Sequence, residues 1–187
     1  MNEQTCSTKW GQEEELEVLL NDLMTNYGTI LKRHIYLYVH NWTVADDLTQ
    51  DVFITVYMKY HQLKEKELIK SWLFQIATNK ARDYLRSWAY RKLIFTDSVS
   101  HKKSLSSDSL EDVLFSREGY SELLEAVLQL PIKYREVIIL FYYHDFTLRE
   151  VKDILCVPQA TVKTRLARAK QKLREHMSNK EKGDRFG

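Results

Sequence analysis

The scarcity of chain-breaking residues constrains this sequence more than any other feature. Only five glycines and two prolines occur in 187 residues. Because glycine and proline most disfavour helix interiors, a chain with so few of them favours long helices. Neither strand-like alternation nor an internal repeat is found, and the sequence therefore predicts an all-α fold.

Apolar residues recur at helical spacing along most of the chain. Leu16, Leu19, Leu20 and Leu23 occupy positions i, i+3, i+4 and i+7, and the pattern continues to Tyr38. Thr43, followed by Asp46, is expected to cap the next helix. The same criteria predict helices over residues 43–60, 71–92, 123–130, 132–143, 148–155 and 161–177.

The segment between residues 98 and 121 interrupts this pattern. It contains eight serines and only weak periodicity, a composition typical of linkers, with one helical turn expected near residues 110–115. We therefore predict two small helical domains, residues 1–95 and 122–187, joined by a flexible linker over residues 96–121.

The net charge of +2 conceals blocks of alternating sign. Residues 1–69 and 93–159 have charge balances of −5 and −4, whereas residues 70–92 and 160–187 have balances of +5 and +6. Two compact basic blocks in a more acidic context indicate two separate contacts with a polyanion. The simpler alternative is that each basic block is an ordinary solvated surface.

Several classes of function are excluded by what the sequence lacks. The two cysteines, Cys6 and Cys156, provide neither a disulfide framework nor a zinc-binding spacing, so no metal is predicted. A Gly-rich phosphate loop and paired histidines at ligand spacing are missing, and we predict neither a cofactor nor an enzyme. His144 and Asp145 fit a helix end better than a catalytic dyad.

Secretion and membrane insertion are not expected either. The N-terminus lacks the basic and apolar regions of a signal peptide. The longest apolar run, Val137–Tyr143, has seven residues, far short of the roughly 20 that span a bilayer. These features predict a cytoplasmic protein with no direct membrane insertion.

The second basic block has the proportions of a helix-turn-helix. The helix Leu148–Leu155 precedes a break at residues 156–158, and a basic helix follows. Thr161 is expected to cap this helix and to direct its free N–H groups at a phosphate. The groove-facing residues are predicted to be Lys163, Thr164, Ala167 and Arg168, and the phosphate-binding residues Arg165, Lys170 and Lys172. The alternative is a basic surface helix on a bundle.

The first basic block combines cations with aromatic residues on one predicted helix. Basic groups hold a nucleic-acid backbone and aromatic rings stack unpaired bases, so this mixture indicates a site for single strands. Trp72 and Tyr84 are expected to lie in the core instead. The candidate DNA-binding residues are Gln75, Asn79, Lys80, Arg82, Arg86, Trp88 and Arg91.

The C-terminal motifs resemble one protein family closely. Leu130-Pro131, Arg135-Glu136-Val137, Glu150-Val151 and the run Thr161–Ala169 resemble the fourth conserved region of the extracytoplasmic-function sigma factors. These proteins are small members of the sigma-70 family of bacterial RNA polymerase subunits. The resemblance implies that the helix over residues 161–177 reads the −35 promoter element.

Two N-terminal segments resemble the same family. Trp72–Asn79 followed by Asp83–Arg86 is similar to the helix that recognises and melts the −10 element, where a base is flipped out of the duplex. Asn79 and the loop Leu63–Lys70 would then meet that base. Unstacking costs only a few kcal/mol per base, so binding energy alone can open the site without nucleotide hydrolysis.

The run Asp47–Phe53 is similar to the segment with which the family docks on the clamp helices of the polymerase large subunit. The exposed, polymerase-facing residues are expected to be Asp47, Gln50, Asp51 and Ile54, and the buried stripe Leu48, Val52 and Val56. The implied partners are core RNA polymerase, promoter DNA and often an anti-sigma factor, either soluble or membrane-bound.

The resemblance covers residues 18–92 and 122–177, with departures at a few positions. Leu63 replaces a usual aromatic, Lys152 a small residue, and Cys156 and Ala160 usual glycines. If Cys156 is left-handed, its side chain costs roughly 1–2 kcal/mol. A weaker or altered −35 interaction is expected, and Lys152→Ala would then strengthen promoter binding.

The main alternative is a stand-alone helix-turn-helix transcriptional regulator with an N-terminal ligand or dimerisation domain. Such a protein would bind specific duplex DNA without polymerase. It would give no reason for the second basic, aromatic helix.

Overall fold

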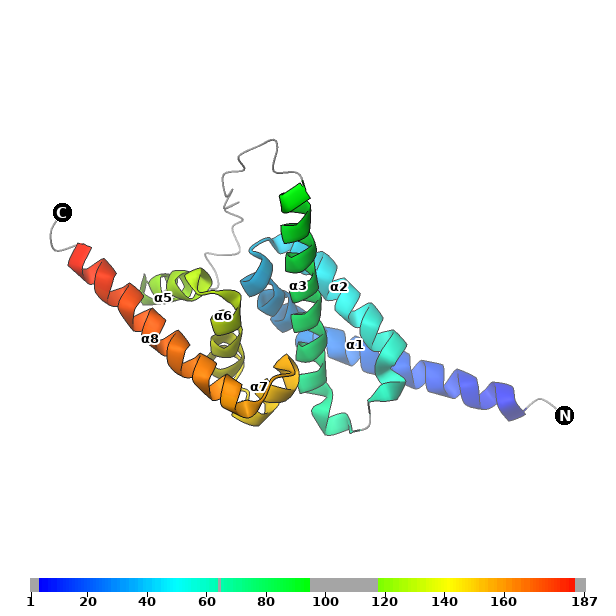
Figure 1. The fold of residues 1–187 in the computed structure, drawn as a ribbon. Coiled ribbons are helices and arrows are strands. Elements are labelled where there is room, and N and C mark those ends of the chain that lie inside the picture. Colours follow the sequence, from blue (N-terminus) through cyan, green and yellow to red (C-terminus); the bar gives the residue numbers. More distant parts are fainter. Residues whose placement is uncertain (1–3, 64, 95–117, 184–187) are drawn as a thin grey trace. The chain divides into compact units, whose positions relative to one another are not determined.

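A computed structural model describes residues 4–63, 65–94 and 118–183, and these form helices and short connections without a strand (Figure 1). The all-α prediction is confirmed. The chain divides into two compact units, Met1–Phe95 and Thr96–Gly187. The helical turn expected near residues 110–115 lies outside the described residues. Within the described part of the chain, no helix is both long enough and apolar enough to cross a bilayer.

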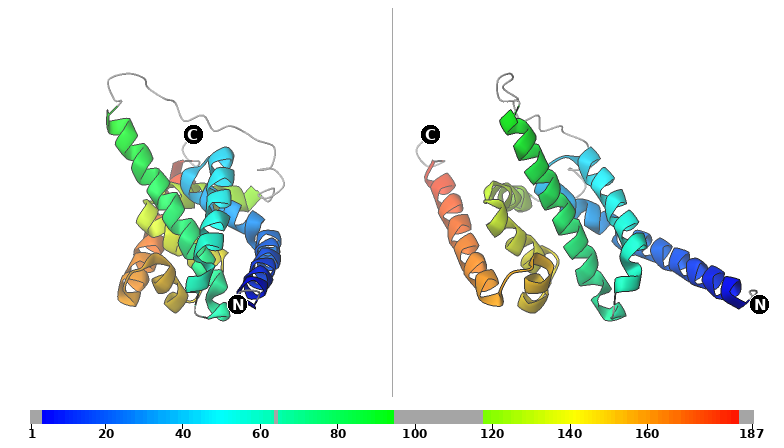
Figure 2. Two further views of the ribbon diagram at one scale, coloured as in Figure 1. Left: turned by 90° about the vertical axis from the view of Figure 1, so that its right-hand side faces the viewer. Right: turned by 45° about the vertical axis from the view of Figure 1, so that its right-hand side comes forward.

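Three helices form the N-terminal unit: α1 (Gln4–Val39), α2 (Trp42–Lys59) and α3 (Ile69–Ile94). Each packs on the other two, and α2 and α3 lie side by side in both views of Figure 2. The short helices η1 (Tyr60–Gln62) and η2 (Lys66–Leu68) connect α2 to α3. Fully buried side chains from all three helices fill the core: Leu31, Ile35, Tyr38, Val52, Val56, Leu73 and Phe74.

The junction between α1 and α2 differs from the sequence prediction. Asn41, and not Thr43, caps α2, because its Oδ1 accepts a hydrogen bond from the N–H of Val44 at 3.0 Å. Asn41 serves because α1 ends close by: His40 is left-handed, with φ of 55°, and its N–H bonds to the oxygen of Tyr36 at 2.8 Å. The chain therefore turns one residue before Asn41, which becomes the natural N-cap.

The C-terminal unit contains α5 (Glu118–Gln129), α6 (Ile132–Ile138), the π-helical turn η3 (Ile139–Tyr143), α7 (Leu148–Leu155) and α8 (Gln159–Gly183). The helix α5 begins earlier than predicted and ends before Pro131, which cannot continue a helix. The helix α8 packs on α5, α6 and α7. The core of the C-terminal unit includes these fully buried side chains: Val137, Leu140, Val151, Val162 and Ala169.

Candidate nucleic-acid interface

The first helix of the predicted helix-turn-helix is held at its start by a capping box. The Oγ1 of Thr147 accepts from the N–H of Glu150 at 3.3 Å, and Glu150 Oε2 accepts from the N–H of Thr147 at 2.8 Å. Two main-chain donors that the helix leaves unpaired are thereby satisfied. On the inner face of the motif, Val151, Leu155 and Val162 are buried, whereas Val157 in the turn is half-buried.

The turn between α7 and α8 closes through a left-handed residue. Cys156 has φ 53° and ψ 46° and is exposed. The N–H of Val157 bonds to the oxygen of Lys152 at 3.1 Å, and that of Cys156 to Asp153 at 3.4 Å. This pair of bonds is a Schellman motif, which usually has glycine at the left-handed position. Cys156 is therefore left-handed, the conformation in which its side chain is predicted to cost roughly 1–2 kcal/mol.

The side chain of Lys152 lies away from the helix-turn-helix core. Its Nζ lies 3.0 Å from a carboxylate oxygen of Asp153, and the side chain is 40% exposed. A long side chain at this position could hinder close packing of the two helices, but the partly exposed side chain of Lys152 is paired with Asp153. The effect of Lys152 on promoter binding stays a prediction.

A row of exposed residues runs along α8 opposite its buried stripe. Val162, Leu166 and Ala169 are buried against the rest of the unit. The predicted groove-facing and phosphate-binding residues that are exposed are Lys163, Thr164, Ala167, Arg168, Lys170 and Lys172. The Nζ of Lys170 also lies 5.2 Å from the ring centroid of the exposed Tyr142. The helix thus presents polar and basic side chains along one continuous face.

One prediction for this helix is wrong, and a second is not favoured by the structure. The helix begins at Gln159, so Thr161 lies within the first turn and does not cap it. The oxygen of Pro158 accepts from Thr161 and Val162, at 2.9 and 3.2 Å, and this starts the helix earlier. Arg165 is turned inward, with its Nη1 2.9 Å from Oε1 of Glu136 on α6. Its expected phosphate contact stays a prediction that this placement does not favour.

The residues of the predicted −10 face of α3 vary more in exposure than those of the exposed row on α8. Asn79 and Arg86 are exposed, whereas Gln75, Lys80 and Arg82 are half-buried. The side chains of Trp88 and Arg91 lie outside the described residues. On the opposite side, the buried residues are Leu73, Phe74, Ala77 and Ala81. Trp72 and Tyr84, expected in the core, are half-buried.

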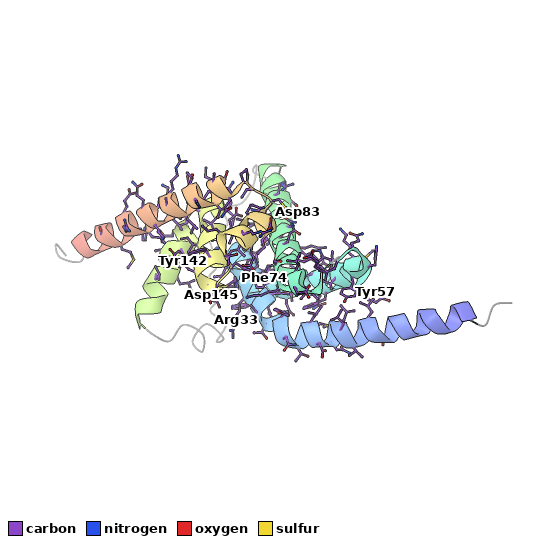
Figure 3. All side chains as sticks on the ribbon, turned by 90° about the horizontal axis from the view of Figure 1, so that it is seen from below. Arg33, Tyr57, Phe74, Asp83, Tyr142 and Asp145 are labelled. Atoms are coloured by element: carbon purple, nitrogen blue, oxygen red, sulfur yellow. The ribbon has the colours of Figure 1, made fainter. Side chains whose placement is uncertain are left out.

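Ion pairs engage two cations of α3. Lys80 Nζ lies 3.6 Å from a carboxylate oxygen of Asp51 on α2, and Arg86 Nη2 lies 3.5 Å from Asp83. Asp83 is labelled on α3 in Figure 3, where Phe74 lies at the contact with α1. The Lys80–Asp51 pair joins a predicted DNA-binding residue to a predicted polymerase-binding residue.

A buried polar contact fixes α3 against α1, and the sequence analysis missed it. Nε2 of His34 and Oγ1 of Thr78 lie 3.0 Å apart, and both residues are fully buried. The ring of His34 meets that of Phe74 edge-on, at 5.0 Å between centroids. The only signal for this contact was His34 at an apolar position of the helical pattern. Because Thr78 precedes Asn79, the contact helps to set the direction in which Asn79 points.

The predicted docking face of α2 is exposed as expected. Asp47, Gln50, Asp51 and Ile54 lie on the surface, while Val52 and Val56 are fully buried. Leu48, also predicted for the buried stripe, is only half-buried. Beyond Ile54, two further exposed apolar side chains, Tyr57 (labelled in Figure 3) and Met58, extend this surface. Their exposed fractions are 52% and 66%. The sequence analysis did not single them out.

Two conserved sequence families match the chain, one in each unit. The family described as Sigma-70 region 2 matches residues 23–90, and the family described as Sigma-70, region 4 matches residues 120–173. The first match spans the packed parts of α1, α2 and α3. The second spans α5 to most of α8, including the helix-turn-helix. Both regions of a sigma-70 factor therefore occur in order.

Curated relatives agree with these matches. The chain is 29% identical to the ECF RNA polymerase sigma factor SigW of Bacillus subtilis, over 83% of this chain and 87% of that protein. It is 30% identical to SigM of the same organism, over 70% of this chain and 78% of that protein. The chain belongs to the extracytoplasmic-function (ECF) sigma factors of the sigma-70 family. Its function is that of an RNA polymerase sigma factor, an initiation subunit and not an enzyme, so both predictions are confirmed.

Solved structures show the same fold. CnrH, solved in complex with the cytosolic domain of CnrY, superposes with a TM-score of 0.64 at 20% identity, covering 87% of this chain and 90% of that chain. RpoE of Bartonella quintana, solved with the anti-sigma factor NepR, gives a TM-score of 0.63 at 21% identity, covering 90% and 97%.

Proposed function

We propose that this sigma factor holds a promoter at two places, with α8 on the −35 element and α3 on the −10 element. The observation that supports this division is the pair of basic helical faces, one in each matched unit. We assign residues 1–95 to core docking and −10 recognition, residues 96–121 to a linker, and residues 122–187 to −35 recognition.

The exposed row of α8 suits a major groove. Lys163 and Arg168 can donate to guanine edges, Thr164 can bond to either base type, and Ala167 leaves room for a thymine methyl group. Lys170 and Lys172 flank this row and can bind phosphates. Each well-placed base contact is worth about 1–3 kcal/mol of discrimination.

The face of α3 suits a strand that is leaving the duplex. Asn79 is exposed and offers an amide to the edge of an unpaired base. We assign contact with the same base to the loop Leu63–Lys70. Arg82, Arg86 and Lys80 are placed for the strand backbone, with Gln75, Trp88 and Arg91 completing the predicted site. Leu63, half-buried in this loop, replaces an aromatic ring that would stack the base.

The exposed face of α2 is assigned to core polymerase. Its carboxylates, Asp47 and Asp51, would attract a basic partner helix, and Ile54 would be covered on docking. Since RpoE of Bartonella quintana, which has a similar fold, was solved with the anti-sigma factor NepR, we also propose an anti-sigma partner for this chain. We also propose that the protein acts in the bacterial cytoplasm, where core polymerase and promoter DNA are found.

Run-off transcription with purified bacterial core polymerase on genomic fragments tests the proposal. New start sites are expected only when this chain is added, with −10 and −35 sequences shared among them. Footprinting of duplex DNA by the chain alone, with no new start site, would favour the stand-alone regulator instead. That alternative offers no role for the basic face of α3.

A further inference from the structure

Two adjacent side chains of α6 hold the helices on either side of it. Nη2 of Arg135 donates to the main-chain oxygens of Leu128 and Leu130 at the end of α5, the second at 3.1 Å. The neighbouring Glu136 accepts from Nη1 of Arg165 on α8 at 2.9 Å. Charge-assisted hydrogen bonds thus tie both α5 and α8 to one short helix.

The depth of the Arg165–Glu136 pair separates it from the other ion pairs. The side chain of Glu136 is 3% exposed and that of Arg165 is 24% exposed, against 53% and 33% for Asp51 and Lys80. A buried carboxylate that loses its partner is costly, whereas an exposed pair contributes little. The pair is therefore a strong constraint on where Arg165 can lie.

Arg165 belongs to the buried stripe of α8. Val162, Arg165, Leu166 and Ala169 occupy positions i, i+3, i+4 and i+7, and the three apolar members are buried. Successive residues of an α-helix are about 100° apart around its axis. A side chain anchored inward at Arg165 therefore fixes the direction of the groove-facing residues, Thr164 and Arg168 among them.

We propose that Arg165 is a positioning residue for promoter recognition and does not bind DNA phosphate. Held by Glu136, it sets the rotation of α8 about its own axis and so places the base-reading side chains. This inference rests on the proposed function of α8 as the −35 reader. It assigns to the Arg135-Glu136 motif the task of orienting the recognition helix.

The salt dependence of DNA binding separates positioning from phosphate contact. Each phosphate contact contributes about 0.9 to the slope of log K against log salt concentration on duplex DNA. The full chain would be titrated with a mixed-sequence duplex of about 30 base pairs between about 50 and 200 mM KCl. Arg165→Gln should leave this slope unchanged, while Lys172→Gln, a matched change at an exposed residue of α8, should lower it by about 0.9.

Glu136→Gln provides a second test, because the two roles predict different salt slopes for it. If Glu136 merely withheld a phosphate-binding arginine, releasing it would steepen the slope by about 0.9. The positioning role predicts an unchanged slope and a fall of about tenfold in run-off from start sites found with the unaltered chain, because base contacts are misplaced. The double variant should lose no more than either single one.

Three outcomes decide the matter. An unchanged slope with reduced run-off in both variants supports positioning. A lower slope for Arg165→Gln, or a steeper slope for Glu136→Gln, overturns it. If Lys163→Gln, Lys170→Gln and Lys172→Gln all leave the slope unchanged, α8 does not bind DNA and the proposed function itself fails. Circular dichroism would check helicity, and Glu136→Gln, which preserves size, decides alone if Arg165→Gln does not fold.

Discussion

The two basic helices differ in how freely they display their charge. On α8, Lys163, Arg168 and Lys172 are exposed, and within the described part of the chain no ion pair engages them. On α3, Lys80 and Arg86 are paired with Asp51 and Asp83. A face of unpaired cations is ready for the regular phosphates of a duplex. Cations that must first exchange partners suit a site that acts later, when the strands separate.

The supports of these helices differ as well. The inward charge of α8 is Arg165, bound to a buried carboxylate, whereas α3 is fixed by the buried hydrogen bond between His34 and Thr78. In the C-terminal unit a buried ion pair holds α8, whereas in the N-terminal unit a hydrogen bond beside the ring of Phe74 holds α3. The two basic helices are therefore held in place by different contacts in the two units.

Destabilising one unit alone should give the largest effect. Phe74→Ala removes a fully buried ring that packs on His34, and is expected to cost the N-terminal unit about 3–5 kcal/mol of unfolding free energy. Calorimetry should show its transition shifting while that of the C-terminal unit stays. Leu123→Ala, at an exposed position of α5, is the control and should change little. A single transition that moves as a whole would show that the units unfold together.

Removing a base-reading side chain from α8 should come next in size. Arg168→Ala is expected to weaken promoter binding by the holoenzyme by about 1–3 kcal/mol, and to relax preference at one base pair of the −35 element. Competition binding with promoter variants measures both. Lys172→Ala should instead weaken all sequences alike, and equal loss of preference in the two variants would contradict the assignment.

The corresponding change on α3 should act on opening and not on duplex binding. Asn79→Ala removes an exposed amide. The free energy of promoter opening is expected to become less favourable by about 1 kcal/mol, the typical value of one hydrogen bond. Permanganate reactivity of unpaired thymines measures opening. Asn26→Ala on α1 is a matched control at an exposed residue. Reduced duplex binding with unchanged opening would reverse the roles of the two helices.

Relief of backbone strain should have a smaller, stabilising effect. Cys156→Gly removes a left-handed side chain costing roughly 1–2 kcal/mol, but glycine loses more conformational entropy on folding, by roughly 0.5–1 kcal/mol. The C-terminal unit is therefore expected to gain up to about 1.5 kcal/mol of unfolding free energy, measured by urea unfolding. Cys156→Ser keeps the side chain and should show no such gain.

The smallest effect is expected at the ion pair between α2 and α3. Lys80→Gln breaks a pair whose side chains are 33% and 53% exposed, and such pairs contribute about 0.2–1 kcal/mol. Stability of the N-terminal unit should therefore fall only slightly, and less still in high salt. A loss as large as that of Phe74→Ala would show that Lys80 supports the fold and not the interface.

Much of this architecture could be predicted from periodicity. The helical spacing alone predicted which side of α2 is buried, with Val52 and Val56, and which is exposed, with Asp47 and Asp51. Helix ends were harder, since Asn41 and Thr43 are both good caps and only the left-handed residue at His40 decides between them. A left-handed Cys156 was raised only as a condition, because Cys156 stands where glycine is usual, and the Schellman bonds that close the turn were not predicted.

Contacts between distant segments could not be predicted in the same way. Arg165 stands in a run of cations, and the composition of that run favoured a phosphate contact. Its place among buried residues of α8 was visible in the spacing, but the carboxylate that makes burial tolerable lies 29 residues earlier in the sequence. The partner of His34 lies 44 residues away, beyond the reach of any local pattern.

The aromatic stack at the first helix junction has a practical consequence. The ring of Trp42 lies parallel to that of Tyr36, with centroids 4.0 Å apart. All four tryptophans of the chain, Trp10, Trp42, Trp72 and Trp88, precede residue 96. Indole emission is therefore a built-in optical reporter of one half of the molecule, and the half that contains α8 is silent at those wavelengths. Changes in the N-terminal unit can therefore be followed by tryptophan emission without attaching a dye.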